Sequence, residues 1–299
     1  MIAAGYSNGY IVIYNIETKE HLKFFTASDY PVTSLRWKPH SDEKPKNILL
    51  AGTADGKIVH WHTLSGRTLH TIDEPESPVM CLDYNSDGTL FAAAGNDKKV
   101  KLYDEQMKVK INTMKSGGFN HPGHSNRIFS LCFHKTNSNL LASGGWDNTV
   151  QFYDMKTSQV VNSIFGPHIC GDSIDLKDNY LLTGSWDTKN QLQLWDIRTF
   201  QLVETMKWDK DRKESNTHVY SAQFSKRENS NMFAVGCSNN NIYRIFDMDQ
   251  QNLPITGCDY MWKPVYTVDF SNNGDYFAYG SGDGNVRILQ LGRNKQIDI

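Results

Sequence analysis

Short apolar runs separated by polar turns follow one another along the whole chain. The apolar runs are four to seven residues long and are broken by Asn, Asp, Gly and Ser. This punctuation predicts short β-strands joined by tight turns, and no long helical pattern interrupts it. The pattern therefore predicts an all-β protein.

The strand pattern repeats along the sequence. A turn Asp or Asn is followed six residues later, and once eight residues later, by an aromatic or large apolar residue. These pairs define seven copies, which are Asn8/Tyr14, Asp55/Trp61, Asp97/Tyr103, Asp147/Tyr153, Asp187/Trp195, Asn240/Phe246 and Asp283/Leu289. The second members of successive pairs stand 42 to 51 residues apart, so the repeat is in the forties.

A complete copy is predicted to hold four strands. The turn joins two middle strands, an outer strand follows, and six copies carry an inner strand upstream, such as VTSLRW at 32–37 and VYTVDF at 265–270. Four short antiparallel strands, repeated seven times, predict a seven-bladed β-propeller of four-stranded antiparallel blades. The first copy has no inner strand, so we expect the first blade to lack it. We expect residues 1–299 to form a single domain.

The repeats resemble the WD-repeat (WD40) β-propeller family. The Trp-Asp dipeptide that names the family stands at Trp195-Asp196, and a Gly-His pair stands at Gly123-His124. Degenerate forms of the dipeptide are Tyr103-Asp104, Tyr153-Asp154 and Phe246-Asp247. The resemblance implies a WD40 propeller over nearly the whole chain.

The resemblance also implies a structural tetrad that hydrogen-bonds through a blade. The fifth copy matches it best, with His168, Thr183, Asp187 and Trp195. The fourth copy nearly matches it with His124, Ser143 and Asp147, but Tyr153 replaces the Trp. The other copies lack these four residues, so we expect no such network in them.

The missing inner strand would leave unpaired backbone groups along the neighbouring strand of the first blade. Three explanations stay open: Met1 is a truncated or misassigned start, a partner donates a strand, or water satisfies the edge. We rank truncation or solvation ahead of donation. At the other end, Ile297 and Ile299 align with Leu22 and Phe24, so the last blade should make its own outer strand.

Composition narrows the function classes. With 31 basic and 33 acidic residues the formal charge is -2, so no general basic field for nucleic acid exists. No apolar run approaches the roughly 18 residues of a membrane span, and no signal-peptide pattern follows Met1. Five cysteines without C-x-x-C spacing predict neither a disulfide framework nor a zinc site. We expect a cytoplasmic protein that binds no nucleic acid, membrane, metal or cofactor.

No motif of the chain indicates catalysis. The sequence contains no H-E-x-x-H, P-loop or G-x-G-x-x-G, and GYSNG at 5–9, which has the spacing of G-x-S-x-G, lies in the first predicted hairpin. The run GSGDG at 280–284 is predicted to be a hairpin turn, because no helix follows to present its N-terminal amides to a phosphate. The regularly spaced turn Asp residues are expected to cap their turns. We expect a protein that is not an enzyme, has no small-molecule substrate and acts by recognition.

One face of the propeller is predicted to bind proteins. In the family that the chain resembles, the middle turns and the loops before the inner strands share one face. The residue before the turn Asp is Trp in the fourth and fifth copies, Trp146 and Trp186. Comparable rim positions on the inner strands hold Arg127, Phe129, His218, Tyr220 and Tyr266. Trp, Tyr and Arg are favoured at binding hot spots. The alternative is that both Trp side chains fold down onto the blades.

A second candidate surface is LQLWDIR at 192–198. It resembles the W-D-x-R pattern of WD proteins that act as substrate receptors of cullin-type ubiquitin ligases, which implies that Trp195, Asp196 and Arg198 meet an adaptor. The alternative is that Arg198 caps a turn. We expect a non-enzymatic protein–protein interaction scaffold within a multi-subunit complex. Such a ligase receptor and a structural part of a cytoskeletal or ciliary assembly are the alternatives.

Overall fold

The computed structural model describes residues 1–18, 20–39, 47–75, 77–114, 123–206, 217–239, 241–250, 253–258, 261–292 and 295–298. The turn residue Asn240, the terminal Ile299 and parts of the loops before two inner strands, residues 115–122 and 207–216, lie outside these ranges. The chain divides into two compact units, Met1–Ser163 and Ile164–Ile299, which are described separately.

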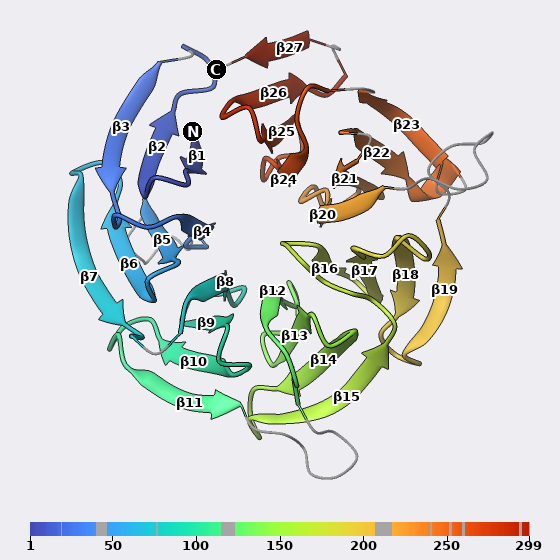
Figure 1. The fold of residues 1–299 in the computed structure, drawn as a ribbon, viewed down its shortest axis with the longest axis horizontal. Helices are drawn as coiled ribbons and strands as arrows, with labels where there is room; N and C mark the ends of the chain where they lie inside the picture. The colour runs from blue at the N-terminus through green and yellow to red at the C-terminus, as the bar shows by residue number, and fades with distance from the viewer. Residues whose placement is uncertain are drawn as a thin grey trace. The chain divides into compact units, whose positions relative to one another are not determined.

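The first unit holds three antiparallel sheets and most of a fourth, here called blades 1 to 4 (Figure 1). Blade 1 consists of β1 (Ile2–Gly5), β2 (Tyr10–Tyr14) and β3 (His21–Thr26). Blade 2 consists of β4 (Val32–Trp37), β5 (Ile48–Thr53), β6 (Lys57–His62) and β7 (Arg67–Asp73). Blade 3 consists of β8 (Val79–Tyr84), β9 (Leu90–Gly95), β10 (Val100–Asp104) and β11 (Lys110–Met114). Blade 4 consists of β12 (Ile128–Phe133), β13 (Leu140–Gly145), β14 (Thr149–Asp154) and β15 (Gln159–Phe165), whose last residues belong to the second unit.

The second unit holds blades 5 to 7, which repeat the same up-and-down order. Blade 5 consists of β16 (Ile174–Lys177), β17 (Tyr180–Gly184), β18 (Leu192–Asp196) and β19 (Gln201–Thr205). Blade 6 consists of β20 (His218–Phe224), β21 (Met232–Ser238), β22 (Tyr243–Asp247) and β23 (Leu253–Cys258), with the 3-10 helix η1 (Met248–Gln250) after β22. Blade 7 consists of β24 (Val265–Phe270), β25 (Tyr276–Ser281), β26 (Val286–Gln290) and β27 (Lys295–Asp298).

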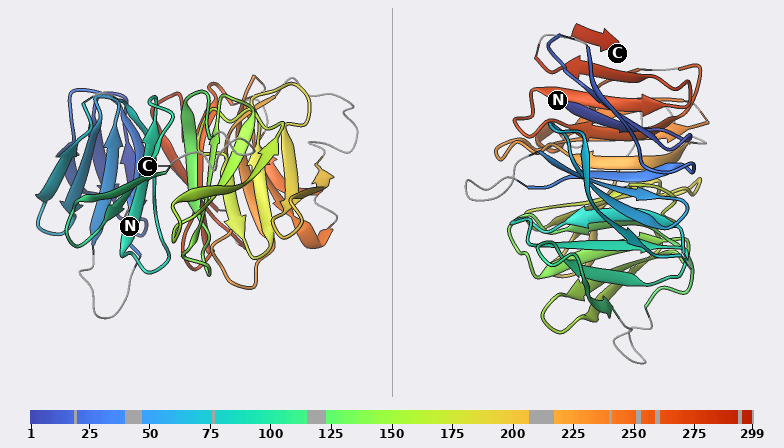
Figure 2. Two further views of the ribbon diagram at one scale, coloured as in Figure 1. Left: turned by 90° about the horizontal axis from the view of Figure 1, so that it is seen from below. Right: turned by 90° about the vertical axis from the view of Figure 1, so that its left-hand side faces the viewer.

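The predicted fold class is confirmed. Within the described ranges six sheets have four strands and the first has three, so the chain is an all-β, seven-bladed β-propeller whose first blade lacks its inner strand. The predicted outer strand of the last blade is also confirmed, since β27 pairs with β26 and Ile297 lies opposite Ile288. In the side views the strands of each sheet run alternately up and down between hairpin turns (Figure 2).

The middle strands form the core because a blade is covered on both faces. All six residues of β5 are buried, whereas every residue of the outer strand β19 is exposed. Within the first unit, Leu50 and Ile58 of blade 2 pack with Val79 and Leu82 of blade 3. Continuous apolar runs such as ILLAG follow from this two-sided burial.

Five inner strands contain a β-bulge near their start. The register shifts lie between Val32/Ser34, Val79/Cys81, Ile128/Ser130, Val219/Ser221 and Val265/Thr267. The extra residues are Thr33, Met80, Phe129, Tyr220 and Tyr266. A bulged residue has no cross-strand partner and can be aimed away from the ladder. The bulge thus gives each of these blades one side chain that the register does not constrain.

A buried carboxylate ties blade 2 to blade 3. Glu105, which follows β10, is 2% exposed and accepts hydrogen bonds from Lys38 Nζ (3.1 Å), His60 Nε2 (3.1 Å) and Tyr84 OH (3.2 Å). Lys108 Nζ lies 2.5 Å from Glu105 Oε1. Burial alone would raise the pKa of Glu105, but the bonds from His60 and Lys108 lower it to about 2. A buried charge of this kind is stable only while its partners remain.

Candidate functional site

An aromatic pair and an arginine meet at the turn end of blade 4. The bulge residue Phe129 stacks on Trp146, with ring centroids 5.2 Å apart and planes 30° apart. The Arg127 guanidinium lies 5.5 Å from the centroid of the Trp146 ring, within cation–π range. The Arg127 carbonyl accepts the N–H of Trp146 at 2.9 Å. A Cβ at Gly145 would stand 2.4 Å from that carbonyl oxygen, so glycine is needed for this close approach.

A longer row of aromatic rings crosses the second unit from blade 5 to blade 7. Trp186 stacks on His218 with centroids 4.6 Å apart, and its ring lies 6.3 Å from that of Tyr220. The Tyr220 ring in turn meets the Tyr266 ring edge to face at 5.0 Å. Tyr220 and Tyr266 are bulge residues of β20 and β24. The side chains that bulges release therefore contact one another from blade to blade.

These rings are held in place yet remain accessible. Trp146 and Trp186 are 38% and 39% exposed, and Tyr266 is 49% exposed. Neither indole is folded into the core, because each stacks on one neighbouring ring and shows part of its surface to solvent. Burial raises the pKa of the Tyr220 hydroxyl, a shift that Trp186 opposes. Large, partly exposed and mutually supported rings match the residue types and geometry of protein-binding hot spots.

Sequence reasoning missed an exposed aromatic residue in a loop before an inner strand. Trp262 is 95% exposed and lies in the loop before β24, four residues ahead of Tyr266. The search took only residues next to the middle turns and on the inner strands, whereas this tryptophan stands in the connecting loop. Reading the loops before the inner strands for large aromatics would have found it.

The tetrad predicted in blade 5 is only partly assembled. The Trp195 indole N–H donates to Thr183 Oγ1 at 3.1 Å. Asp187 is exposed, and its carboxylate accepts the backbone N–H groups of Thr188 (2.6 Å) and Lys189 (3.4 Å), which is a turn cap. The His168 backbone N–H donates to Ser185 Oγ at 3.0 Å. The turn Asp of this blade therefore does not close a network with the histidine.

Blade 4, whose sequence matches the family's tetrad less well than that of blade 5, holds the more complete network. His124 Nδ1 lies 2.8 Å from Asp147 Oδ2, and Nε2 lies 2.6 Å from Ser143 Oγ. Ser143 Oγ reaches the Tyr153 hydroxyl at 3.4 Å. Burial would raise the pKa of Asp147, but the bond from His124 outweighs it, so the pKa is lowered. The ionised carboxylate can only accept, so Nδ1 carries the proton in that bond.

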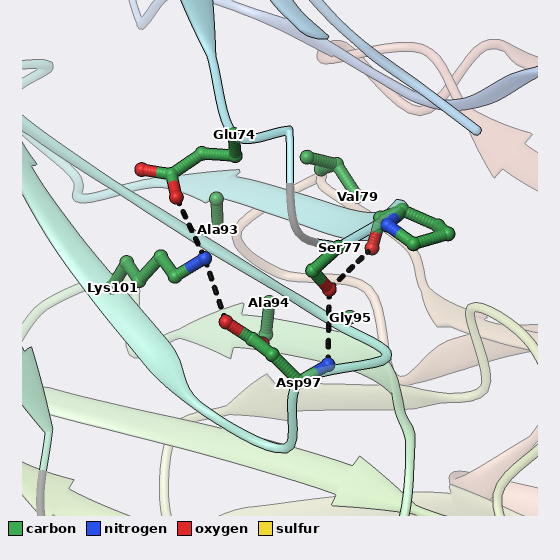
Figure 3. Close-up of a pocket in the computed structure, with 9 residues that line it drawn as sticks. Glu74, Ser77, Val79, Ala93, Ala94, Gly95, Asp97 and Lys101 are labelled. Carbon is green, nitrogen blue, oxygen red and sulfur yellow. Dashed lines mark hydrogen bonds and ion pairs between the residues drawn. The ribbon is translucent and has the colours of Figure 1, made fainter. Parts of the chain in front are cut away.

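Blade 3 has a different network, which is ionic (Figure 3). Lys101 Nζ bridges Glu74 Oε2 (2.8 Å) and Asp97 Oδ2 (2.7 Å). The Tyr103 hydroxyl donates to Glu74 Oε1 at 2.6 Å, and the Asp97 N–H donates to Ser77 Oγ at 2.9 Å. Burial opposes ionisation of Glu74, yet the bonds from Lys101 and Tyr103 lower its pKa to about 2. A Glu, a Lys and a Tyr stand here in place of the family's residue types, so the family's tetrad pattern does not reveal this network.

The W-D-x-R segment forms an internal ion pair. Arg198 Nη2 lies 2.7 Å from Asp196 Oδ2, and Arg198 Nε donates to Asp196 Oδ1 at 3.1 Å. These hydrogen bonds lower the pKa of Asp196 to about 2. The Arg198 side chain is still 67% exposed. A partner carboxylate would have to share this guanidinium with Asp196.

Two kinds of site are not found in the described part of the chain. No group of three or more His, Cys, Asp or Glu residues there is arranged to hold a metal ion. No helix there is long and apolar enough to cross a membrane.

Three features together define a WD-repeat β-propeller. The antiparallel blades repeat every forty to fifty residues, one middle strand ends in Trp-Asp, and one blade holds a His–Asp–Ser network. The chain belongs to the family described as "LRRK2 beta propeller", which matches residues 1–180, and the "WD domain, G-beta repeat" family matches residues 255–289.

Several known proteins are similar to this chain. "WD repeat-containing protein slp1" of Schizosaccharomyces pombe is 23% identical over 267 residues, which is 85% of this chain and 49% of that protein. "APC/C activator protein CDH1" of Saccharomyces cerevisiae is 24% identical over 210 residues, 69% of this chain and 35% of that protein. "Autophagy-related protein 16" of Arabidopsis thaliana is 22% identical over 264 residues, 86% of this chain and 48% of that protein. The chain thus spans half or less of the length of these relatives.

A solved structure shares the fold. A chain of the "Crystal Structure of Mitotic Checkpoint Complex" superposes with a TM-score of 0.79 at 19% identity, covering 97% of this chain and 83% of that one. At this identity the likeness speaks for the fold alone.

Proposed function

We propose that this propeller is a non-enzymatic protein–protein interaction scaffold that binds partners through the aromatic residues at the turn ends of its blades. One observation carries the proposal: Trp146 and Trp186 stay partly exposed while the bulge residues Phe129 and Tyr220 contact their rings. Tyr266 extends the second of these contacts through the Tyr220 ring. Rings fixed in this way lose little conformational freedom when a partner covers them. The residues are therefore prepared for binding.

The relatives support this class of function. Their names describe an APC/C activator and a WD repeat-containing protein. A scaffold of this class needs no cofactor and no small-molecule substrate. We propose proteins as its partners and neither nucleic acid nor membrane.

Capture of partners by wild type and by the Trp146→Ala/Trp186→Ala double variant tests the proposal. Each truncated hot spot costs on the order of 2 kcal/mol of binding free energy, which is about a thirtyfold loss of affinity. We expect the double variant to lose the partners that quantitative mass spectrometry finds with wild type. Its melting temperature should change little, because the two indoles lie outside the core.

A matched control distinguishes specific binding at Trp146 and Trp186 from non-specific binding of exposed aromatic residues. Phe165→Ala removes another exposed aromatic side chain, 73% exposed, from the outer strand β15. The control should keep the wild-type partners. Unchanged capture by the double Trp variant would refute the proposed surface, and equal loss in the Phe165 variant would show that capture is non-specific.

A second candidate function is that of a protein subunit of a larger complex, namely the substrate receptor of a cullin-type ubiquitin ligase. The exposed Arg198 of the W-D-x-R segment favours it, together with relatives named as cofactors or activators of the APC complex. Arg198→Ala should then remove ligase subunits from the captured set while partners that bind through Trp146 and Trp186 remain. Retention of those subunits would exclude this route.

We propose a cytoplasmic setting, with a cytoskeletal or ciliary assembly as the alternative, and imaging of the tagged full chain distinguishes the two. We also propose that residues 1–299 unfold as a single domain. A single calorimetric transition, with equal calorimetric and van't Hoff enthalpies, is the expected result.

A further inference from the structure

A groove of about 280 Å³ opens at the other ends of blades 5 and 6, away from the middle turns that carry Trp186. Its lining residues come from the β16–β17 hairpin, the inner strand of blade 6, the loop before β21, and η1. They are Lys177, Asp178, Tyr180, Phe224, Asn231, Met248 and Asp249. Tyr180 and Met248 both pack against the core of the second unit, so the floor of the groove is apolar.

Hydrogen bonds fix the walls of the groove. Lys177 Nζ donates to the carbonyl oxygens of Ser225 (3.0 Å), Arg227 (2.9 Å) and Ser230 (2.5 Å), which holds the β20–β21 loop against blade 5. On the other side, Asn231 Nδ2 donates to Asp249 Oδ1 at 2.8 Å. The groove is thus preformed, and binding need not order it.

The charges of the lining select a cation. Three carbonyl oxygens accept hydrogen bonds from the Lys177 ammonium, and with Asp178 and Asp249 the lining has a formal charge of −1. Asp249 is exposed, and Oδ2 of its carboxylate accepts no hydrogen bond from the described residues. A second carboxylate, Asp178, lines the same groove. An apolar floor beside exposed carboxylate oxygens suits a long side chain with an aliphatic stem and a cationic head.

Among such side chains arginine fits best. The guanidinium presents several donors in one plane and stacks on aromatic rings, so it can bond the Asp249 carboxylate while lying against Tyr180. We propose that this groove is a second binding site of the propeller, which takes an arginine side chain of a partner protein. The site is independent of Trp146 and Trp186 and of the scaffold function proposed above.

Titration of the full chain with small probes tests the proposal. The protein is labelled at its methionine methyl groups, and N-acetyl-arginine amide is added while NMR follows the Met248 methyl resonance. The matched probes are N-acetyl-citrulline amide, which is neutral and nearly isosteric, N-acetyl-lysine amide and N-acetyl-glutamate amide. We expect a saturable shift of the Met248 resonance with the arginine probe and clearly weaker effects with the other three.

Two variants locate the charge that is responsible. Asp249→Asn should weaken binding of the arginine probe by about three- to tenfold, which is the range for a partly exposed, charge-assisted pair. Asp275→Asn is the control, because Asp275 is likewise exposed and accepts a bond from a nearby asparagine, Asn273, at 2.6 Å, but it lies in blade 7. Equal binding of citrulline or glutamate, equal binding of lysine, or no effect of Asp249→Asn would overturn the arginine assignment.

Discussion

The rings of Tyr220 and Tyr266, from the inner strands of consecutive blades, meet edge to face with centroids 5.0 Å apart. Each is the extra residue of a β-bulge, so neither has a cross-strand partner in its own sheet. The contact therefore joins two positions that strand pairing leaves unconstrained. It forms part of a row that continues through Tyr220 to Trp186.

Removal of the central ring should loosen this row. In Tyr220→Ala, Trp186 and Tyr266 each lose an aromatic neighbour, worth about 0.5–1.5 kcal/mol for such a pair. We expect the Trp186 resonance of 5-fluorotryptophan-labelled protein to shift and sharpen in ¹⁹F NMR, while the Trp146 resonance of blade 4 stays in place. An unchanged Trp186 resonance would mean that His218 alone positions the indole.

Of the turn aspartates Asp147 and Asp187, we expect Asp147 to contribute more to the free energy of unfolding. Asp147→Ala leaves the buried Nδ1–H of His124 without its acceptor, and we expect unfolding to become easier by about 1–3 kcal/mol. Asp187→Ala removes only an exposed turn cap and should cost about 0.5 kcal/mol or less. Denaturant unfolding of both variants checks the order, and equal losses would contradict the structural assignment.

Stability should fall in acid through Glu105. Its pKa of about 2 in the folded chain lies below the ordinary value of 4.5, so its contribution is complete above pH 5 and is lost as the pH falls from 4.5 toward 2. Burial also lowers the pKa of His60, so charging this histidine costs stability below its ordinary value of 6.5. Both groups act in the same direction.

Glu105→Gln tests this assignment. At pH 7 the variant should lose about 3 kcal/mol, because Lys38 and Lys108 keep their charges without the carboxylate, and its stability should depend less on pH between 4.5 and 2. Glu20→Gln, a change at an exposed position, is the control and should follow the wild-type curve. Parallel curves for Glu105→Gln and wild type would remove Glu105 from the explanation.

Backbone amides at the inner edge of the first blade should exchange hydrogen faster than the equivalent amides of the second blade. In the described chain β1 pairs only with β2, and the Tyr6 N–H bond to Tyr10 sets the alternation that points the Ala3 and Gly5 N–H groups away from β2. The equivalent amides in blade 2, at Leu50 and Gly52, face the inner strand β4.

Hydrogen exchange of the isolated chain measures this difference. We expect Ala3 and Gly5 to exchange faster than Leu50 and Gly52. Addition of an upstream segment or of a strand-donating partner should then slow them. Equal protection in the isolated chain would show that the edge is already satisfied and would end the donated-strand explanation.

The repeat in the sequence was enough to predict the blades, because two-sided burial requires apolar runs and the hairpins require turn residues at a fixed spacing. ILLAG of β5 and the turn at Asp55 show both requirements in one blade. The absent inner strand of blade 1 was found in the same way. The short helix η1 leaves no such mark, since three residues carry no periodicity.

The networks and the bulges were harder to predict. The sequence did not reveal the Lys101 bridge in blade 3, because the ionic residues that form it do not match the residue types of the family's tetrad. A bulge adds one residue to a strand, which changes the register but not the apolar pattern around it. The sequence thus indicated Phe129 and Tyr220 as rim residues without revealing the backbone device that places them there.

The bulge also separates the residue that is free to vary for recognition from the paired residues that are needed for folding. The residue that it frees is Thr33, Met80, Phe129, Tyr220 or Tyr266 in five blades of one chain, so a hydroxyl, a thioether and aromatic rings all fit the same backbone setting. A change of chemistry at this position leaves the ladder intact. Mutation can therefore diversify what the propeller recognises, blade by blade, while selection for folding acts on the paired residues on either side.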